Sequence, residues 1–180
     1  MEQEVIAAVG YKTPGRDNLK EWAATKVTQA LVDAATQDGL RYHRQETTHG
    51  VRSFYRPFAS TGLLGFTTRA SPSDISATVI DTHKAIQKIS TANLEGAKAR
   101  ATVAFYNEEF ETNKEYVDFL GTSLTGNTTN FTGTDAVTEA ISKVSAADVK
   151  KVVDGMMAQK PVLYATGDLL EFPSIRQLGL

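Results

Sequence analysis

The order of signals in the later part of the chain constrains its fold more than any other feature. A hydrophobic segment punctuated by glycines, Gly62–Thr68, is followed by three helical patterns. After them come an amphipathic segment that opens at Ser145, a second apolar run within Lys160–Asp168, and a tail that contains Pro173. Strands that cluster beside a run of helices predict one sheet with helices packed on one side, an α+β fold.

The upstream residues add strands and one helix to this expectation. Glu4–Tyr11 is predicted to be a strand, because Val5–Val9 within it is a short apolar run. Apolar residues at three- and four-residue spacing predict a helix over Asn18–Thr36, which Gly39 is expected to close. The runs Val51–Phe58 and Leu63–Thr68 predict two adjacent antiparallel strands.

Five helices are expected after these strands. Ser71 is interpreted as the N-cap of the first, with Pro72 in its first turn and Asp74 complementing the helix dipole. Ser145 and Asp148 have the spacing of a capping box at the start of the last. The expected helices cover residues 71–89, 93–105, 115–124, 135–141 and 145–157, and a final strand covers 161–166. We expect that strand to pair with the first one, around a core that includes Leu63, Phe66, Val79, Ile86 and Val162.

Composition is that of an ordinary globular domain. The 180 residues are 41% hydrophobic and 22% charged, which is enough for a single domain, 1–180, with a sizeable core. The net charge of −2 provides no basic field for nucleic acid. The absence of cysteine excludes disulfides and thiolate metal sites. No apolar run approaches the roughly 20 residues that cross a bilayer, and no targeting peptide is recognisable, so any targeting segment is expected outside this chain.

The segment His43-Arg-Gln-Glu46-Thr-Thr-His49 is the nearest approach to a zinc motif. Inverted zinc motifs carry His-x-x-Glu-His on one helix, so that both histidines and the acid meet at one ion. Here Thr47 occupies the position of the second histidine, and the polar segment predicts a loop. We therefore expect no metal-binding residue.

Other chemistry-bearing residues favour structural roles. His83 lies on the apolar face of its predicted helix, where a hydrogen-bonded core or interface histidine is the expected role. The aromatic residues Phe105, Tyr106 and Phe110 predict core or helix–helix packing. The acidic set is Glu108, Glu109, Glu111 and Glu115, which favours a solvated helix face. No Gly-x-Ser-x-Gly elbow is present, so we expect no catalytic residue and no cofactor.

Three segments together carry a resemblance to a known family. They are Ser60–Phe66 (STGLLGF), Asn93–Arg100 (NLEGAKAR) and the C-terminal series VSAADV, VLYATGD and PSIRQL, which begin at Val144, Val162 and Pro173. In this order they resemble the second domain of the mitochondrial processing peptidase-like proteins, which have the pitrilysin/insulinase-type metallopeptidase fold. The likeness is greatest to the second core proteins of ubiquinol–cytochrome c reductase.

The resemblance implies a function as well as a fold. It implies a non-catalytic structural core subunit, or a fragment of one, on the matrix side of the mitochondrial inner membrane. Its expected partners are a companion processing-peptidase-like domain, a core protein and other respiratory-complex subunits. The alternative is the C-terminal, substrate-closing domain of a processing peptidase subunit, with zinc on another domain or chain. Family members have two such domains, so the resemblance also implies that the first half is missing or separate.

Overall fold

The computed structural model describes residues 4–41, 50–110, 112–125, 133–170 and 172–179. Within these ranges the chain forms four strands and six helices. They are β1 (Val5–Pro14), α1 (Leu19–Arg41), β2 (Val51–Pro57), β3 (Thr61–Ala70), α2 (Ile75–Gln87), α3 (Leu94–Phe110), α4 (Asn113–Thr125), α5 (Thr134–Ser142), α6 (Ala146–Met157) and β4 (Val162–Thr166). The α+β prediction is confirmed.

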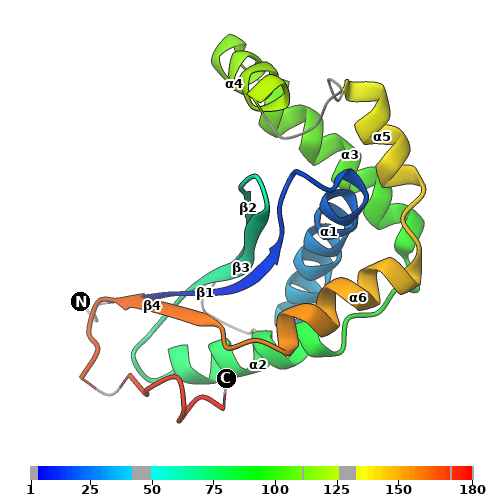
Figure 1. Ribbon diagram of the computed structural model, residues 1–180. Helices are drawn as coiled ribbons and strands as arrows, with labels where there is room; N and C mark the ends of the chain where they lie inside the picture. The colour runs from blue at the N-terminus through cyan, green and yellow to red at the C-terminus, as the bar shows by residue number, and fades with distance from the viewer. Residues whose placement is uncertain (1–3, 42–49, 111, 126–132, 171, 180) are drawn as a thin grey trace.

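The sheet is antiparallel throughout and has the strand order β2-β3-β1-β4. The expected pairing of the first and last strands is confirmed, with Val9 opposite Leu163. The expected pairing of the second and third is confirmed as well, with Tyr55 opposite Leu64. Helices α1, α2 and α6 lie against one face of the sheet, and α3 and α5 pack on the far side of α1 (Figure 1).

Alternation along the strands directs one set of side chains toward these helices. Val5, Ala7, Val9 and Tyr11 of β1 are all buried, as expected for every second residue of a half-covered strand. They pack into one cluster with Leu64 and Phe66 of β3 and with apolar residues of the covering helices, including Val27, Val79, Ile86 and Val153. We call this side of the sheet the covered face.

Two residues of the expected core are corrected by the structure. Val162 is 66% exposed and Leu63 is only partly buried, whereas Phe66 is fully buried. Val162 lies opposite Gly10, and Leu63 lies opposite Lys12, on the side of the sheet that no described helix covers. The error arises because an apolar run in a strand does not reveal which of its two faces is covered.

Two helices are longer than the sequence predicts. Helix α1 continues through Gly39 to Arg41, because a glycine inside a helix costs only about 1 kcal/mol relative to alanine and does not end it. Helix α3 continues past Phe105 to Phe110. The last residues of α3 carry part of the acidic set, which is why the sequence pattern alone ended the helix early.

The helix starts give one correction and one confirmation. Ser71 does not cap α2, since its carbonyl oxygen accepts hydrogen bonds from Asp74 N and Ile75 N in a turn before the helix. The N-cap is Asp74, and the Ser71 hydroxyl donates to its carboxylate instead of capping an amide. At α6 the capping box of Ser145 and Asp148 is present as predicted.

None of the helices in the described ranges combines the length and apolar character that crossing a bilayer requires.

Candidate functional site

His83 is held by two side chains of the protein. Its Nδ1 lies 2.6 Å from Tyr11 Oη, and its Nε2 lies 2.8 Å from the amide nitrogen of Gln87. With that amide donating to Nε2, the neutral ring carries its proton on Nδ1 and donates it to the Tyr11 oxygen. Burial lowers the pKa of His83 and raises the pKa of the Tyr11 phenol above its usual range. Both ring nitrogens are therefore occupied, and the expected structural role of His83 agrees with this geometry.

Two residues of the acidic set, Glu108 and Glu115, make structural contacts. The Glu115 carboxylate accepts a hydrogen bond from Thr112 N at 2.9 Å, and Thr112 Oγ1 accepts one from Glu115 N, which caps α4. Glu108 forms an ion pair with Lys26 of α1. Glu111 lies outside the described residues, and the structure describes only the backbone of Glu109. The described carboxylates thus fix helix ends and helix contacts.

Lys26 is a buried cation that the sequence analysis did not single out. Its side chain is 2% exposed, and its ammonium group lies 5.8 Å from the centre of the Tyr55 ring while it binds Glu108. The Tyr55 hydroxyl in turn donates to Pro14 O at 2.7 Å. The sequence could have indicated that Lys26 is buried, because it lies one helical turn after Trp22 on the apolar face of α1.

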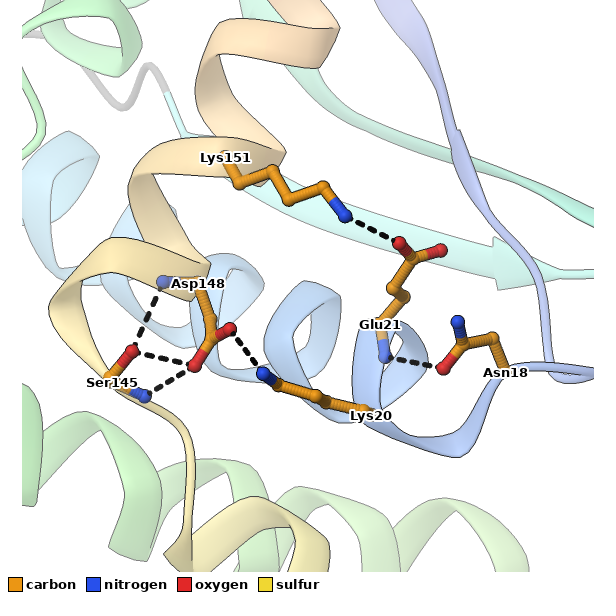
Figure 2. Close-up of polar contacts among 6 residues, drawn as sticks. All are labelled: Asn18, Lys20, Glu21, Ser145, Asp148 and Lys151. Atoms are coloured by element: carbon orange, nitrogen blue, oxygen red, sulfur yellow. Dashed lines mark hydrogen bonds and ion pairs between the residues drawn. The ribbon is translucent and has the colours of Figure 1, made fainter.

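A polar constellation joins α1 to α6 (Figure 2). Lys151 of α6 binds the Glu21 carboxylate at 2.7 Å, and Lys20 of α1 binds Asp148 at 3.0 Å. Ser145 donates to the same Asp148 carboxylate from its hydroxyl and its backbone amide. A cleft of about 660 Å³ is lined by four of these residues, Lys20, Glu21, Asp148 and Lys151, and its walls also include Lys12 and Thr13 of β1.

The charges of this constellation are matched in pairs. The hydrogen bonds from Ser145, followed by the bond and charge of Lys20, lower the pKa of Asp148 to about 2. The hydrogen bond to Glu21 raises the pKa of Lys151. A carboxylate that stays ionised and an ammonium that stays protonated are poorly suited to general acid–base catalysis near neutral pH. The arrangement fits a polar joint between the two helices.

A metal site was not expected, and the segment that bears on it is His43, Glu46 and His49. All three lie outside the described residues. Within the described ranges, histidine and carboxylate side chains nowhere gather in a group of three that could hold a metal ion.

The second side of the sheet, which we call the open face, has none of the described helices against it. Its central row runs across all four strands as Phe54, Gly65, Gly10 and Val162. Ile6, Ala8 and Leu63 are partly buried around that row, and Tyr164 is 64% exposed beside it. An apolar sheet face of this kind marks an interaction surface.

Glycines bring neighbouring strands and side chains close together on both faces of the sheet, Gly65 on the open face and Gly62 on the covered face. A Cβ on Gly65 would lie 2.0 Å from Val9 O and 2.8 Å from the Phe54 ring. A Cβ on Gly62 would lie 2.7 Å from both Pro14 O and the Tyr55 ring. These glycines are therefore packing positions, the role that the sequence favours for them over ligand contact.

Comparison with known proteins gives two informative relatives. No protein-family model matches the chain. Mitochondrial-processing peptidase subunit alpha-2 of Dictyostelium discoideum is 27% identical to it over 183 residues, which cover 94% of the chain and 41% of the relative. A chain in the structure of Complex III2 from Candida albicans with Inz-5 bound has the same fold, with a TM-score of 0.80 and 16% identity. That match covers 99% of this chain and 46% of the other.

The chain thus spans less than half the length of each of these relatives. The resemblance to the processing-peptidase-like proteins, which the sequence motifs indicate, is confirmed by the similarity to a peptidase subunit and by the shared fold.

Proposed function

We propose that the chain is a non-catalytic structural domain of the core of mitochondrial ubiquinol–cytochrome c reductase, similar to the second half of a second core protein. In this proposal it lies on the matrix side of the inner membrane, peripheral to the bilayer. Its role is structural, because it packs against a companion processing-peptidase-like domain and a neighbouring core protein. Interfaces of that obligate kind bury large apolar areas.

The open face is the observation that carries this proposal. One side of the sheet is sealed by helices, whereas Val162 and Tyr164 on the other side are 66% and 64% exposed. The described polar groups that could have suggested catalysis, namely His83, Glu115 and Asp148, are each engaged in a structural contact. A domain with an uncovered apolar sheet face and occupied polar groups fits an assembly role better than independent catalysis.

The alternative is the substrate-closing domain of a processing peptidase subunit, with zinc on another domain or chain. The similarity to the Dictyostelium peptidase subunit favours it. The two functions differ in what the chain accompanies. A core domain co-purifies with haem-containing reductase, whereas a peptidase domain co-purifies with a zinc subunit that cleaves presequences.

The decisive experiment is native electrophoresis of mitochondria from the source organism. We expect the tagged chain to migrate with ubiquinol–cytochrome c reductase activity. Migration with presequence cleavage instead would favour the peptidase alternative. A small monomer without either activity in its fraction would contradict both.

A second measurement tests the expected lack of metal. The purified chain should contain no stoichiometric zinc after dialysis and should cleave no presequence peptide, because the spacing of His43, Glu46 and His49 does not suit the ion. Bound zinc that disappears in His43→Ala or His49→Ala variants would contradict this expectation.

A further inference from the structure

The cleft between α1, α6 and the end of β1 is lined by three lysines and two carboxylates. Two of the lysines are neutralised, because Lys20 binds Asp148 and Lys151 binds Glu21 (Figure 2). The third, Lys12, is exposed and takes part in no ion pair within the described part of the chain. The cleft therefore holds one positive charge that no described carboxylate balances.

The next residue of β1 supplies an unused hydroxyl to the same cleft. Thr13 is 5% exposed, and its Oγ1 has no hydrogen-bond partner among the residues that the structure describes. Buried polar groups in folded proteins are nearly always hydrogen-bonded, because leaving one unpaired costs its full desolvation penalty. Since Thr13 lines the cleft together with Lys12, a polar group bound there would satisfy this hydroxyl.

Asn18, at the start of α1, provides a further donor. Its Oδ1 accepts a hydrogen bond from Glu21 N at 3.3 Å, which caps the first turn of the helix (Figure 2). That bond occupies the amide oxygen and leaves the NH2 group without a described partner. The cleft thus offers an ammonium, a hydroxyl and an amide NH2 group, which are the donors that hydrogen-bond a carboxylate.

Apolar side chains form the rest of the binding surface. Ala24 and Val152 are buried residues that line the cleft, and Pro14 is partly buried beside them. The volume of about 660 Å³ lies within the range of roughly 300–1,000 Å³ that is usual for small-molecule sites. A single inorganic ion would leave most of that volume empty. The cleft therefore suits a charged group that is attached to a short apolar body.

From these observations we propose that the cleft binds a monocarboxylate with a short aliphatic body. The carboxylate forms an ion pair with Lys12 and accepts hydrogen bonds from Thr13 and Asn18, and the aliphatic body contacts Ala24 and Val152. A free small acid and the C-terminal residue of a peptide both present this chemistry. The binding is additional to the structural role proposed above and does not depend on it.

Two other ligands fit the cleft less well. A phosphate monoester carries a charge of roughly −1.5 to −2 near neutral pH, and it would lie beside Glu21 and Asp148 with one unbalanced lysine. A divalent cation would need those two carboxylates, but each is already bound by a lysine. In the described ranges no group of three histidine or carboxylate side chains could hold such an ion. A single carboxylate matches the charge of Lys12.

The chemistry is tested by calorimetry on the full chain with two acids and their amides. The probes are isocaproate, isocaproamide, and a short acetylated peptide ending in leucine with either a free or an amidated C-terminus. We expect saturable binding of an acid, about tenfold weaker binding of its amide, and weaker binding in added salt. Acetate, which lacks the aliphatic body, should bind more weakly than isocaproate.

The pattern of binding distinguishes the two sources of the carboxylate. Binding of isocaproate and the peptide acid supports a site for either source, and binding of one alone supports a free acid or a peptide C-terminus. The inference is overturned if neither acid binds, or if acid and amide bind equally. It is also overturned if acetate binds as tightly as isocaproate, or if inorganic phosphate binds more tightly than the acids.

Variants place the ligand in the cleft. Lys12→Met should weaken binding of the acid about tenfold, whereas Lys114→Met, at an exposed lysine of α4 without a described ion pair, should not. Thr13→Val should weaken it about threefold to tenfold, whereas Thr68→Val, at another buried hydroxyl without a described partner, should not. Equal losses in a variant and its matched control would overturn the inference.

A measurement on the wild-type chain needs no substitution. Titration with isocaproate should change the backbone amide chemical shifts most strongly at Lys12, Thr13 and Asn18. Changes centred away from the cleft would contradict the proposed site. The urea midpoint serves as the folding control, because Thr13→Val and Thr68→Val both remove an unpaired buried hydroxyl and neither should lower it.

Discussion

The two faces of the sheet are built from the same four strands but differ in the burial of their side chains and in the pairing of nearby charges. On the covered face, helices bury Tyr11 and Phe66, and the buried cation Lys26 is paired with Glu108. On the open face, apolar side chains are partly or largely exposed and the cations Arg52 and Arg56 have no described ion pair. The covered face therefore stabilises the domain, whereas the open face contributes less to the core and leaves side chains accessible.

The sharpest test of this difference compares two phenylalanines on adjacent strands. Phe66→Ala on the covered face should lower the free energy of unfolding by about 3–5 kcal/mol, because it empties a fully buried site. Phe54→Ala on the open face should cost less than about half of that, since its ring is only partly buried. Urea denaturation measures both. Equal costs would mean that the open face is part of the folding core.

The second prediction tests whether the closely spaced strands of the open face tolerate a side chain in place of a glycine. Gly65→Ala should cost about 3 kcal/mol, because the new Cβ would lie 2.0 Å from the backbone oxygen of Val9. Gly155→Ala in α6 is the control, because open space surrounds that position and alanine favours the helix by up to about 1 kcal/mol. Thermal denaturation of the two variants should therefore shift in opposite directions. A neutral Gly65→Ala would contradict the close approach of the strands.

The charged residues of the two faces provide a third comparison. Glu108→Ala should cost about 1–2 kcal/mol, because it leaves the buried Lys26 ammonium without its carboxylate, although the half-exposed site admits some water. Arg56→Gln on the open face should change the free energy of unfolding by less than about 0.5 kcal/mol. If Arg56→Gln were as costly as Glu108→Ala, Arg56 would stabilise the fold although it has no described ion pair.

The smallest expected effect is a dependence of stability on pH at the covered face. Burial lowers the pKa of His83 in the folded state, so the unfolded chain binds its proton more readily. Stability from this group is therefore complete above the ordinary histidine pKa of about 6.5 and decreases as the pH falls from there through the folded-state pKa.

The measurement is the urea midpoint between pH 8 and pH 5. It should be made in a background with His43→Asn and His49→Asn, so that His83 is the remaining histidine. The further change His83→Gln should flatten the profile. An unchanged profile would show that His83 does not contribute to the pH dependence.

Local sequence determined much of what the structure shows. The capping box of Ser145 and Asp148 was predictable because it depends on residues three apart in the chain. The four strands were predictable from short apolar runs, and the antiparallel neighbours β2 and β3 from the short connection between them. The expectation that His43, Glu46 and His49 form no zinc site rests on their spacing alone and stays a prediction, as does the assignment of 1–180 to a single C-terminal domain.

Tertiary structure decided which face of each element is covered. Val162 and Leu163 are equally apolar neighbours, yet pairing with β1 places Val162 on the open face and Leu163 on the covered one. The partner of Lys26 is set by tertiary structure, because α3 brings Glu108 to it. The pairs Lys151–Glu21 and Lys20–Asp148 likewise join residues of α1 and α6 that lie far apart in the sequence. Sequence periodicity records which residues share a side, but only the packing of distant segments determines what lies against that side.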